Sequence, residues 1–221
     1  GHYAGQGGEA AMADCVVIGS QAMDSTADNA QTGTVAIGKS ALTALTSGAR
    51  NTAIGTSALT TETVGDYNVA VGYEALTAQI GVDGTVGNTA VGYGAGSAIA
   101  AGIKNTLVGY QAGAGFDAEG GNTFIGASAG SGSINGADDC VAIGKDALAG
   151  AATQDGTVAV GKDALTALTS GSGNTAVGYQ AGVALDDGTK NTLIGYGTES
   201  GSTGSENQTA IGYGCTAVNT T

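Results

Sequence analysis

A glycine preceded by Ile or Val recurs along nearly the whole chain. It occurs twelve times, at Gly19, Gly38, Gly55, Gly72, Gly92, Gly109, Gly126, Gly144, Gly161, Gly178, Gly195 and Gly212. Eight of the eleven intervals are 17 residues long, and the other three are 18, 19 and 20 residues long. A unit of this length is too short for a helix, a strand and their turns. It predicts one coil of a β-solenoid, in which each coil hydrogen-bonds to the next.

The residues just before this glycine have the composition of a strand. The preceding position is Ile or Val in all twelve units, and the position three before the glycine is Val or Thr in all twelve. These β-branched residues favour extended chain. No charge occupies the four positions that end at the glycine, so the acidic residues lie in the connecting segments. The stretch ALTALTSG, at 41–48 and 164–171, also fits a helical turn, but it is too short for an independent helix.

Successive side chains of a strand point to opposite faces. We expect the Val/Thr and Ile/Val columns to face the inside of the coil and the column between them, mostly Ala, to face outward. A strand that is apolar on both faces is normally covered on both. We therefore predict that the Ala column is an interface with sister chains. Its members are Ala36, Ala53, Ala70, Ala90, Leu107, Phe124, Ala142, Ala159, Ala176, Leu193 and Ala210.

These patterns predict an all-β parallel β-solenoid of about twelve 17-residue coils. Residues 13–221 are expected to form a single solenoid domain, and residues 1–12 a glycine-rich lead-in or cap. Because a solenoid exposes unpaired strand edges at its ends, we expect either further protein after residue 221 or end-to-end stacking into a filament.

The sequences NTAIG, NVAVG, NTAVG, CVAIG and TVAVG resemble the head repeats of trimeric autotransporter adhesins. The NTAVGYQAG units are also similar to repeat arrays in bacteriophage fibre proteins and related bacterial surface proteins. The similarity covers residues 14–216. It implies a left-handed parallel β-roll in a homotrimer, located outside the cell, on the cell surface or on a virion, with adhesion to a receptor or glycan as its role. Adhesin heads use shorter repeats, so adhesin, phage fibre and filament subunit all stay open.

Three columns of asparagine, glycine and tyrosine stand out at and beside the ends of the strands. An asparagine column, which predicts a structural ladder of side-chain amides, consists of Asn51, Asn68, Asn88, Asn105, Asn122, Asn174 and Asn191. The repeated glycine indicates a turn with positive φ or close backbone contact. A tyrosine column directly after the glycine consists of Tyr73, Tyr93, Tyr110, Tyr179, Tyr196 and Tyr213. Because Lys occupies this column in other coils, we expect the tyrosines at a solvent rim, either as stacked rings or as an aromatic strip that binds a glycan or receptor.

The remaining candidate residues have structural interpretations. Cys15 and Cys140 share a column seven coils apart and cannot bridge within one chain, whereas Cys215 lies in another column. These cysteines are interpreted either as small buried residues or as partners in interchain disulfide bridges. Aspartates in connectors, such as Asp138 and Asp155, suit either solvated turns or calcium, but the nonapeptide of calcium solenoids is missing. We expect no cofactor.

Charge and residue content exclude several functions. Six basic and nineteen acidic residues give a net charge of -13, which opposes nucleic acid and anionic membrane as partners. No apolar run of about 18 residues is present to cross a bilayer. An acyltransferase of the left-handed β-helix family needs three hexapeptides per coil and a histidine base in the helix. Here one hexapeptide per coil matches, and the single histidine is His2. We predict a non-enzymatic structural or adhesive fibre segment, with an ice-binding solenoid as the alternative.

Overall fold

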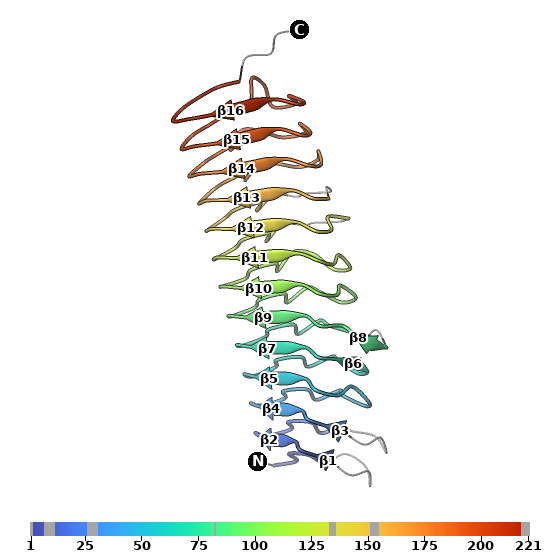
Figure 1. The fold of residues 1–221 in the computed structure, drawn as a ribbon. Helices are drawn as coiled ribbons and strands as arrows, with labels where there is room; N and C mark the ends of the chain where they lie inside the picture. Colours follow the sequence, from blue (N-terminus) through green and yellow to red (C-terminus); the bar gives the residue numbers. More distant parts are fainter. Residues whose placement is uncertain are drawn as a thin grey trace. The chain divides into compact units, whose positions relative to one another are not determined.

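The computed structural model describes residues 2–6, 12–25, 31–81, 83–132, 136–150 and 155–217. The chain is an all-β parallel β-solenoid of about eleven turns, as the repeat predicts. It divides into two compact units, Gly1–Gln111 and Ala112–Thr221. Within each unit, successive strands stack as parallel rungs (Figure 1). Of the expected lead-in 1–12, residues 1 and 7–11 lie outside the described residues, and the expected single domain 13–221 stays a prediction.

The first unit contains one main sheet and two short side sheets. The main sheet has the order β2 (Val16–Ile18), β4 (Val35–Ile37), β5 (Thr52–Ile54), β7 (Val69–Val71), β9 (Thr89–Val91) and β10 (Thr106–Val108). β1 (Met12–Ala13) pairs with β3 (Gln31–Thr32), and β6 (Gly65–Asp66) pairs with β8 (Gly84–Thr85). All of these pairs are parallel and join equivalent residues, for example Ala53 with Ala70. The equivalence confirms the alignment on the repeated glycine.

The second unit has the same pattern of main-sheet strands. Its strands are β11 (Thr123–Ile125), β12 (Val141–Ile143), β13 (Val158–Val160), β14 (Thr175–Val177), β15 (Thr192–Ile194) and β16 (Thr209–Ile211). Each pairs in parallel with the next, and an isolated bridge joins Glu199 to Thr216.

The repeated glycine ends each strand for a steric reason. Gly55 has φ +138° and its N–H donates to the carbonyl of Ile37, 2.7 Å away in the preceding coil. A Cβ on Gly55 would overlap the backbone carbonyl of Gly72 in the following coil. Positive φ and close contact are therefore both present, which confirms the prediction for this column.

The ALTALTSG segments form turns and not helices. Leu42 has φ +52°, which an α-helix does not allow, and its N–H donates to the carbonyl of Ala58 in the next coil at 3.0 Å. The described residues contain no helix, so the helical alternative for 41–48 and 164–171 is wrong. Hydrogen bonds between coils replace those that a helix would make within itself.

The face of the strand that points inward is the opposite of the one expected. The column predicted as an interchain interface has 0 to 5% exposure in the single chain, so it lines the interior of each unit. This correction applies to Ala36, Ala53, Ala70, Ala90, Leu107, Phe124, Ala142, Ala159, Ala176, Leu193 and Ala210. The Val/Thr and Ile/Val columns are half-buried or exposed and point outward.

The physical reason lies on the other side of each coil. Leu59 and Leu165 follow the glycine by four residues and are completely buried. Their side chains fill most of a narrow interior, which leaves room for Ala53 and Ala159 on the strand but not for two β-branched columns. The interior is consequently built from Ala and Leu, and the bulkier strand residues lie outside.

The asparagine ladder is buried and joins side chain to backbone. Asn51 Oδ1 accepts the N–H of Asn68 at 2.8 Å, and Asn68 Oδ1 accepts the N–H of Asn88 at 3.0 Å. In the second unit Asn174 Oδ1 accepts the N–H of Asn191 at 3.0 Å. These residues are at most 1% exposed, so the ladder supplies hydrogen bonds to backbone groups that water does not reach. The predicted structural ladder is confirmed. Its hydrogen bonds run mainly from a backbone N–H to a side-chain oxygen, and not between two side-chain amides.

Candidate functional site

The outward columns of the strands form an uncharged surface, which we call the outer strand face. In each unit it comprises the first and third residue of every main-sheet strand. Its first column is Val16, Val35, Thr52, Val69, Thr89, Thr106, Thr123, Val141, Val158, Thr175, Thr192 and Thr209. Its second column is Ile18, Ile37, Ile54, Val71, Val91, Val108, Ile125, Ile143, Val160, Val177, Ile194 and Ile211. Parallel, in-register pairing repeats these side chains at the coil spacing of about 4.8 Å.

The tyrosines form two stacks, which we call the tyrosine ladders. In the first unit the ring centroids of Tyr73 and Tyr93, and of Tyr93 and Tyr110, are 5.3 Å apart with 10° between the ring planes. In the second unit the corresponding distances are 4.9 Å for Tyr179 and Tyr196, and 5.3 Å for Tyr196 and Tyr213. The side chains of the ladders are 38 to 83% exposed, which confirms the predicted solvent rim. Their role in binding stays a prediction.

The local sequence explains why the rings stack. Each tyrosine follows the repeated glycine, and the residue after it has positive φ, as at Glu74 and Gln180. The turn therefore directs equivalent rings outward from successive coils. The pKa of Tyr73 is raised, first by its hydrogen bond to the Glu74 carboxylate and then by the charge of that carboxylate. The Tyr73 hydroxyl thus has the neighbouring Glu74 carboxylate as its acceptor.

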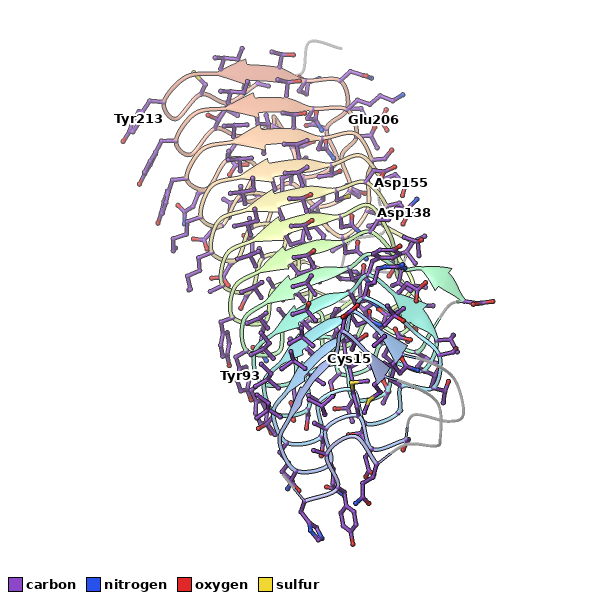
Figure 2. The ribbon with its side chains drawn as sticks, turned by 60° about the horizontal axis from the view of Figure 1, so that its bottom comes forward. Cys15, Tyr93, Asp138, Asp155, Glu206 and Tyr213 are labelled. Atoms are coloured by element: carbon purple, nitrogen blue, oxygen red, sulfur yellow. The ribbon has the colours of Figure 1, made fainter. Side chains whose placement is uncertain are left out.

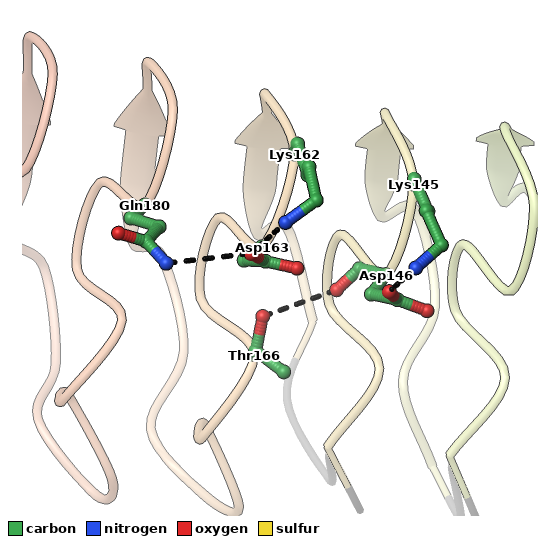
Figure 3. Close-up of polar contacts among 6 residues, drawn as sticks. All are labelled: Lys145, Asp146, Lys162, Asp163, Thr166 and Gln180. Atoms are coloured by element: carbon green, nitrogen blue, oxygen red, sulfur yellow. Dashed lines mark hydrogen bonds and ion pairs between the residues drawn. The ribbon is translucent and has the colours of Figure 1, made fainter.

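Where lysine replaces tyrosine, the same rim carries a row of polar contacts (Figure 3). Lys145 Nζ lies 2.9 Å from Asp146 Oδ2, and Lys162 Nζ lies 2.5 Å from Asp163 Oδ2. Gln180 Nε2 donates to Asp163 Oδ2 at 3.4 Å. The hydrogen bond between Lys162 and Asp163 is the first cause that raises the pKa of the lysine and lowers that of the aspartate. Both lysines are exposed and both aspartates are partly exposed, so the row contributes little to stability.

The lysine row continues into the tyrosine ladder of the second unit. Lys162 Nζ lies 5.1 Å from the ring centroid of Tyr179, within the range of a cation–π contact. The ring faces of this ladder are thus covered by Lys162 on one side of Tyr179 and by the next tyrosine on the other. Tyr179 and Tyr196 therefore present ring edges and hydroxyls to solvent, whereas Tyr213, at the end of the stack, is 83% exposed.

Acidic connectors lie away from this rim in the second unit. Figure 2 shows Asp138, Asp155 and Glu206 along one edge and Tyr213 at the opposite edge. The Asp155 carboxylate accepts the N–H of Asp138 at 3.0 Å, and that of Asp138 accepts the N–H of Gly120 at 2.6 Å. These aspartates therefore act as acceptors that join turns. No group of three or more His, Cys, Asp or Glu that could hold a metal occurs among the described residues.

Of the buried carboxylates that sequence reasoning missed, Glu62 is more deeply buried than Glu119. The Glu62 side chain is completely buried, and Oε1 accepts the N–H groups of Thr63, Val64 and Gly65 at 2.8, 3.1 and 2.8 Å. Burial raises its pKa, against the lowering effect of these hydrogen bonds. The sequence did contain a signal: Glu62 lies seven residues after the repeated glycine, at a position that is leucine in other coils, for example Leu45 and Leu168. The coil of Glu62 also directly precedes the longest interval of the repeat.

The cysteines are free thiols in this chain. Cys140 is buried, whereas Cys15 and Cys215 are partly exposed. Cys140 occupies the asparagine column, where its N–H donates to Asn122 Oδ1 at 2.9 Å. Burial is the main cause that raises the pKa of the Cys140 thiol, so it packs as a small apolar residue.

The fold and these surfaces together define a β-solenoid repeat protein with an uncharged strand face and exposed aromatic ladders. No protein-family profile matches the chain, and a search of curated proteins finds no significant match. Among the described residues, no helix is long and apolar enough to cross a membrane.

Proposed function

We propose that this chain is a non-enzymatic fibre segment that associates with copies of itself through the outer strand face. One observation carries the proposal: this face is uncharged in every coil and at least partly exposed, with Ile or Val in one column and Val or Thr in the other. Side chains such as Ile54 and Ile194 remain 37% exposed in the single chain. A continuous surface of this kind marks an interaction site in a soluble protein.

A second copy of the chain is the occupant that fits this face best. With a net charge of -13, two copies repel each other wherever their acidic connectors meet. The outer strand face is free of charge, and its side chains repeat at the same coil spacing on every copy, so the two surfaces can interdigitate coil by coil. The resemblance to adhesin heads and phage fibres supplies three further parts of this proposal: the homotrimer, the left-handed sense of the coil, and the extracellular, cell-surface or virion location. The count of twelve coils comes from the repeated glycine and also belongs to the proposal.

The oligomeric state of the purified chain tests the proposal directly. Light scattering coupled to size exclusion is expected to give about three times the chain mass of 20.9 kDa. Replacing Val160 and Val177 with lysine on the outer strand face is expected to yield monomers, because charges would then be buried between chains. Ser172→Lys, on an exposed connector, is the matched control and should leave the assembly intact. A native monomer at micromolar concentration would contradict the proposal.

Ice binding is a second candidate because the threonine column points outward. Thr175, Thr192 and Thr209 pair in register on three successive strands of the second unit, each beside an outward Val or Ile. A free face of this kind presents hydroxyl and methyl groups in regular rows. Native protein in dilute solution would then show thermal hysteresis that Thr192→Lys reduces. If the chain is oligomeric and shows no hysteresis, the face belongs to the assembly and this candidate is excluded.

A further inference from the structure

We propose that the tyrosine ladders bind an extended, uncharged polysaccharide of equatorially linked pyranoses, which runs along the coil axis of each unit. The inference rests on the proposed function, because it names the ligand class of a fibre segment located outside the cell. It concerns a surface separate from the outer strand face.

The stacking decides which atoms are available for binding. The rings of Tyr73, Tyr93 and Tyr110 cover one another's faces at 5.3 Å, so a sugar cannot insert between them without breaking the stack. Ring edges and hydroxyls remain exposed, in a row along the axis. A phenol hydroxyl both donates and accepts hydrogen bonds, as sugar hydroxyls do. The ladder is therefore suited to hydrogen-bonding along the side of a polymer.

The repeat distance selects the kind of polymer. Ring centroids follow one another at 4.9 to 5.3 Å. An extended pyranose chain advances by one ring and one glycosidic oxygen per residue, which is close to one coil spacing of about 4.8 Å. A bound peptide strand would present equivalent side chains about 6.6 Å apart and would lose register within three coils. Successive residues of such a chain are turned by about half a turn, so hydroxyls from the two edges of the pyranose alternate opposite successive tyrosines, and a phenol can hydrogen-bond to either.

The charge of the surroundings selects an uncharged polymer. The net charge of -13 opposes polyanionic glycans. The residues that follow the tyrosines are mostly small or neutral, namely Gly94, Gln111, Gln180, Gly197 and Gly214, and the one acid, Glu74, is hydrogen-bonded to Tyr73. A neutral ligand can approach these neighbours without desolvating an unpaired charge.

The ladders are also organised before the ligand arrives. A tyrosine side chain has two rotatable torsions, and stacking restricts both, so little conformational entropy is lost on binding. Stacking within the chain does not by itself explain why tyrosine is present. The same column holds Thr56, Ala127 and Lys145 in coils with the same strand and turn, so the coil forms without the ring. Two runs of three successive tyrosines are what a repeating ligand requires.

Co-sedimentation of the native protein with microcrystalline cellulose and with chitin tests the inference. Binding to at least one of these is expected. The double variant Tyr93→Phe/Tyr196→Phe keeps the stacked rings and removes the central hydroxyl of each ladder, and it should weaken binding about tenfold. Tyr67→Phe is the matched control, because Tyr67 is 46% exposed but lies outside the ladders, where its hydroxyl accepts from Arg50 Nη1 at 3.0 Å. This control should bind like the native protein.

Two results would overturn the inference: no binding of the native protein to either polysaccharide, or equal binding of the native protein and the double variant. Light scattering on the same preparations separates this failure from that of the proposed function. An assembled protein that ignores both polysaccharides contradicts the ligand and leaves the assembly standing. A monomer whose binding depends on the tyrosine hydroxyls contradicts the assembly and supports the ligand.

Discussion

The ring of Phe124 occupies the space that a side chain at Gly130 would need. In five coils where the strand carries alanine, for example those of Ala53 and Ala159, the position equivalent to Gly130 is leucine. The coils of Ala90 and Ala176 have Gly96 and Gly182 there, and leucines of the neighbouring coils fill that space. A large residue on the strand is thus matched by a missing side chain on the opposite wall. At Phe124 and Gly130 the two walls of the coil therefore share one interior space.

This relationship predicts that Gly130→Leu destabilises the protein and that Phe124→Ala rescues it. Gly130→Leu alone overpacks the coil and should cost about 1–3 kcal/mol in the free energy of unfolding, and Phe124→Ala alone about 3–5 kcal/mol through its cavity. The double variant recreates the Ala/Leu pair of other coils. Leucine tolerates this backbone, since Leu59 has φ +50° and Gly130 has φ +59°. Denaturant unfolding of the four proteins measures the coupling, and strictly additive costs would contradict shared volume.

Lysine substitutions on two adjacent strand residues test which face points inward. Ala176→Lys places a charge in the closed interior, where Ala176 is fully buried, and should abolish folding or cost several kcal/mol. Val177→Lys lies on the outer strand face and should change the free energy of unfolding of the isolated chain by about 1 kcal/mol or less. Circular dichroism during urea titration, at a concentration where both variants are monomeric, makes the comparison. The opposite ranking would restore the orientation first expected from the sequence.

The asparagine ladder predicts a large cost for a single amide. Asn174 Nδ2 donates to the carbonyls of Gly171 and Gly188 at 2.9 and 2.7 Å, while Oδ1 accepts the N–H of Asn191. Asn174→Ala leaves these buried groups without partners and should cost about 1–3 kcal/mol or more. Asn174→Asp keeps the acceptor and loses the donors. It should also be destabilising, increasingly so as the carboxylate ionises with rising pH. Unfolding curves equal to those of the native protein would show that water replaces the ladder.

The raised pKa of Glu62 predicts a pH-dependent contribution to stability. The folded-state pKa lies above the ordinary value of 4.5, chiefly because the carboxyl is buried. The stability associated with its protonated form is fully present below about pH 4.5 and is lost as the pH rises through the higher folded-state pKa. Compared with Glu62→Gln, the native protein should therefore lose stability between acidic and neutral pH. Thermal unfolding of both proteins across this range measures the difference, and a difference that does not vary with pH would contradict it.

The same carboxylate completes the turn hydrogen bonds of its coil. In the regular coil before it, the N–H groups of Thr46 and Ser47 donate to the carbonyl of Thr63 in the next coil, at 2.8 and 3.1 Å. Glu62 supplies that acceptor itself, next to the longest interval of the repeat. Glu62→Leu restores the residue type found at Leu45 but removes the acceptor, so we expect a loss of about 1–3 kcal/mol. Leu45→Glu is not expected to stabilise its coil, because the acceptor is already present there.

Much of this architecture could be predicted from residue types at fixed spacing. The strand before Gly55, the positive φ of that glycine and the hydrogen-bonded column that contains Asn51 all follow from local preferences that repeat in every coil. The exposed rim at Tyr93 also followed, because lysine shares its column. The role of Glu62 could not be predicted from the sequence. It depends on which backbone N–H groups of its turn find no carbonyl acceptor in the neighbouring coil.

The sequence by itself determined the period, the register and the place of each strand, because a hydrogen-bonded stack of coils requires equivalent residues to meet. Only the tertiary structure decided which side of the strand is inside. Ala176 on one face and Val177 on the other are both apolar. The alternation of side chains along the three strand residues therefore does not indicate which face is buried. The choice depends on the volume that Leu165 and Leu193 of the neighbouring coils fill beside Gly182, and a volume shared by distant residues exists only once the chain has closed around it.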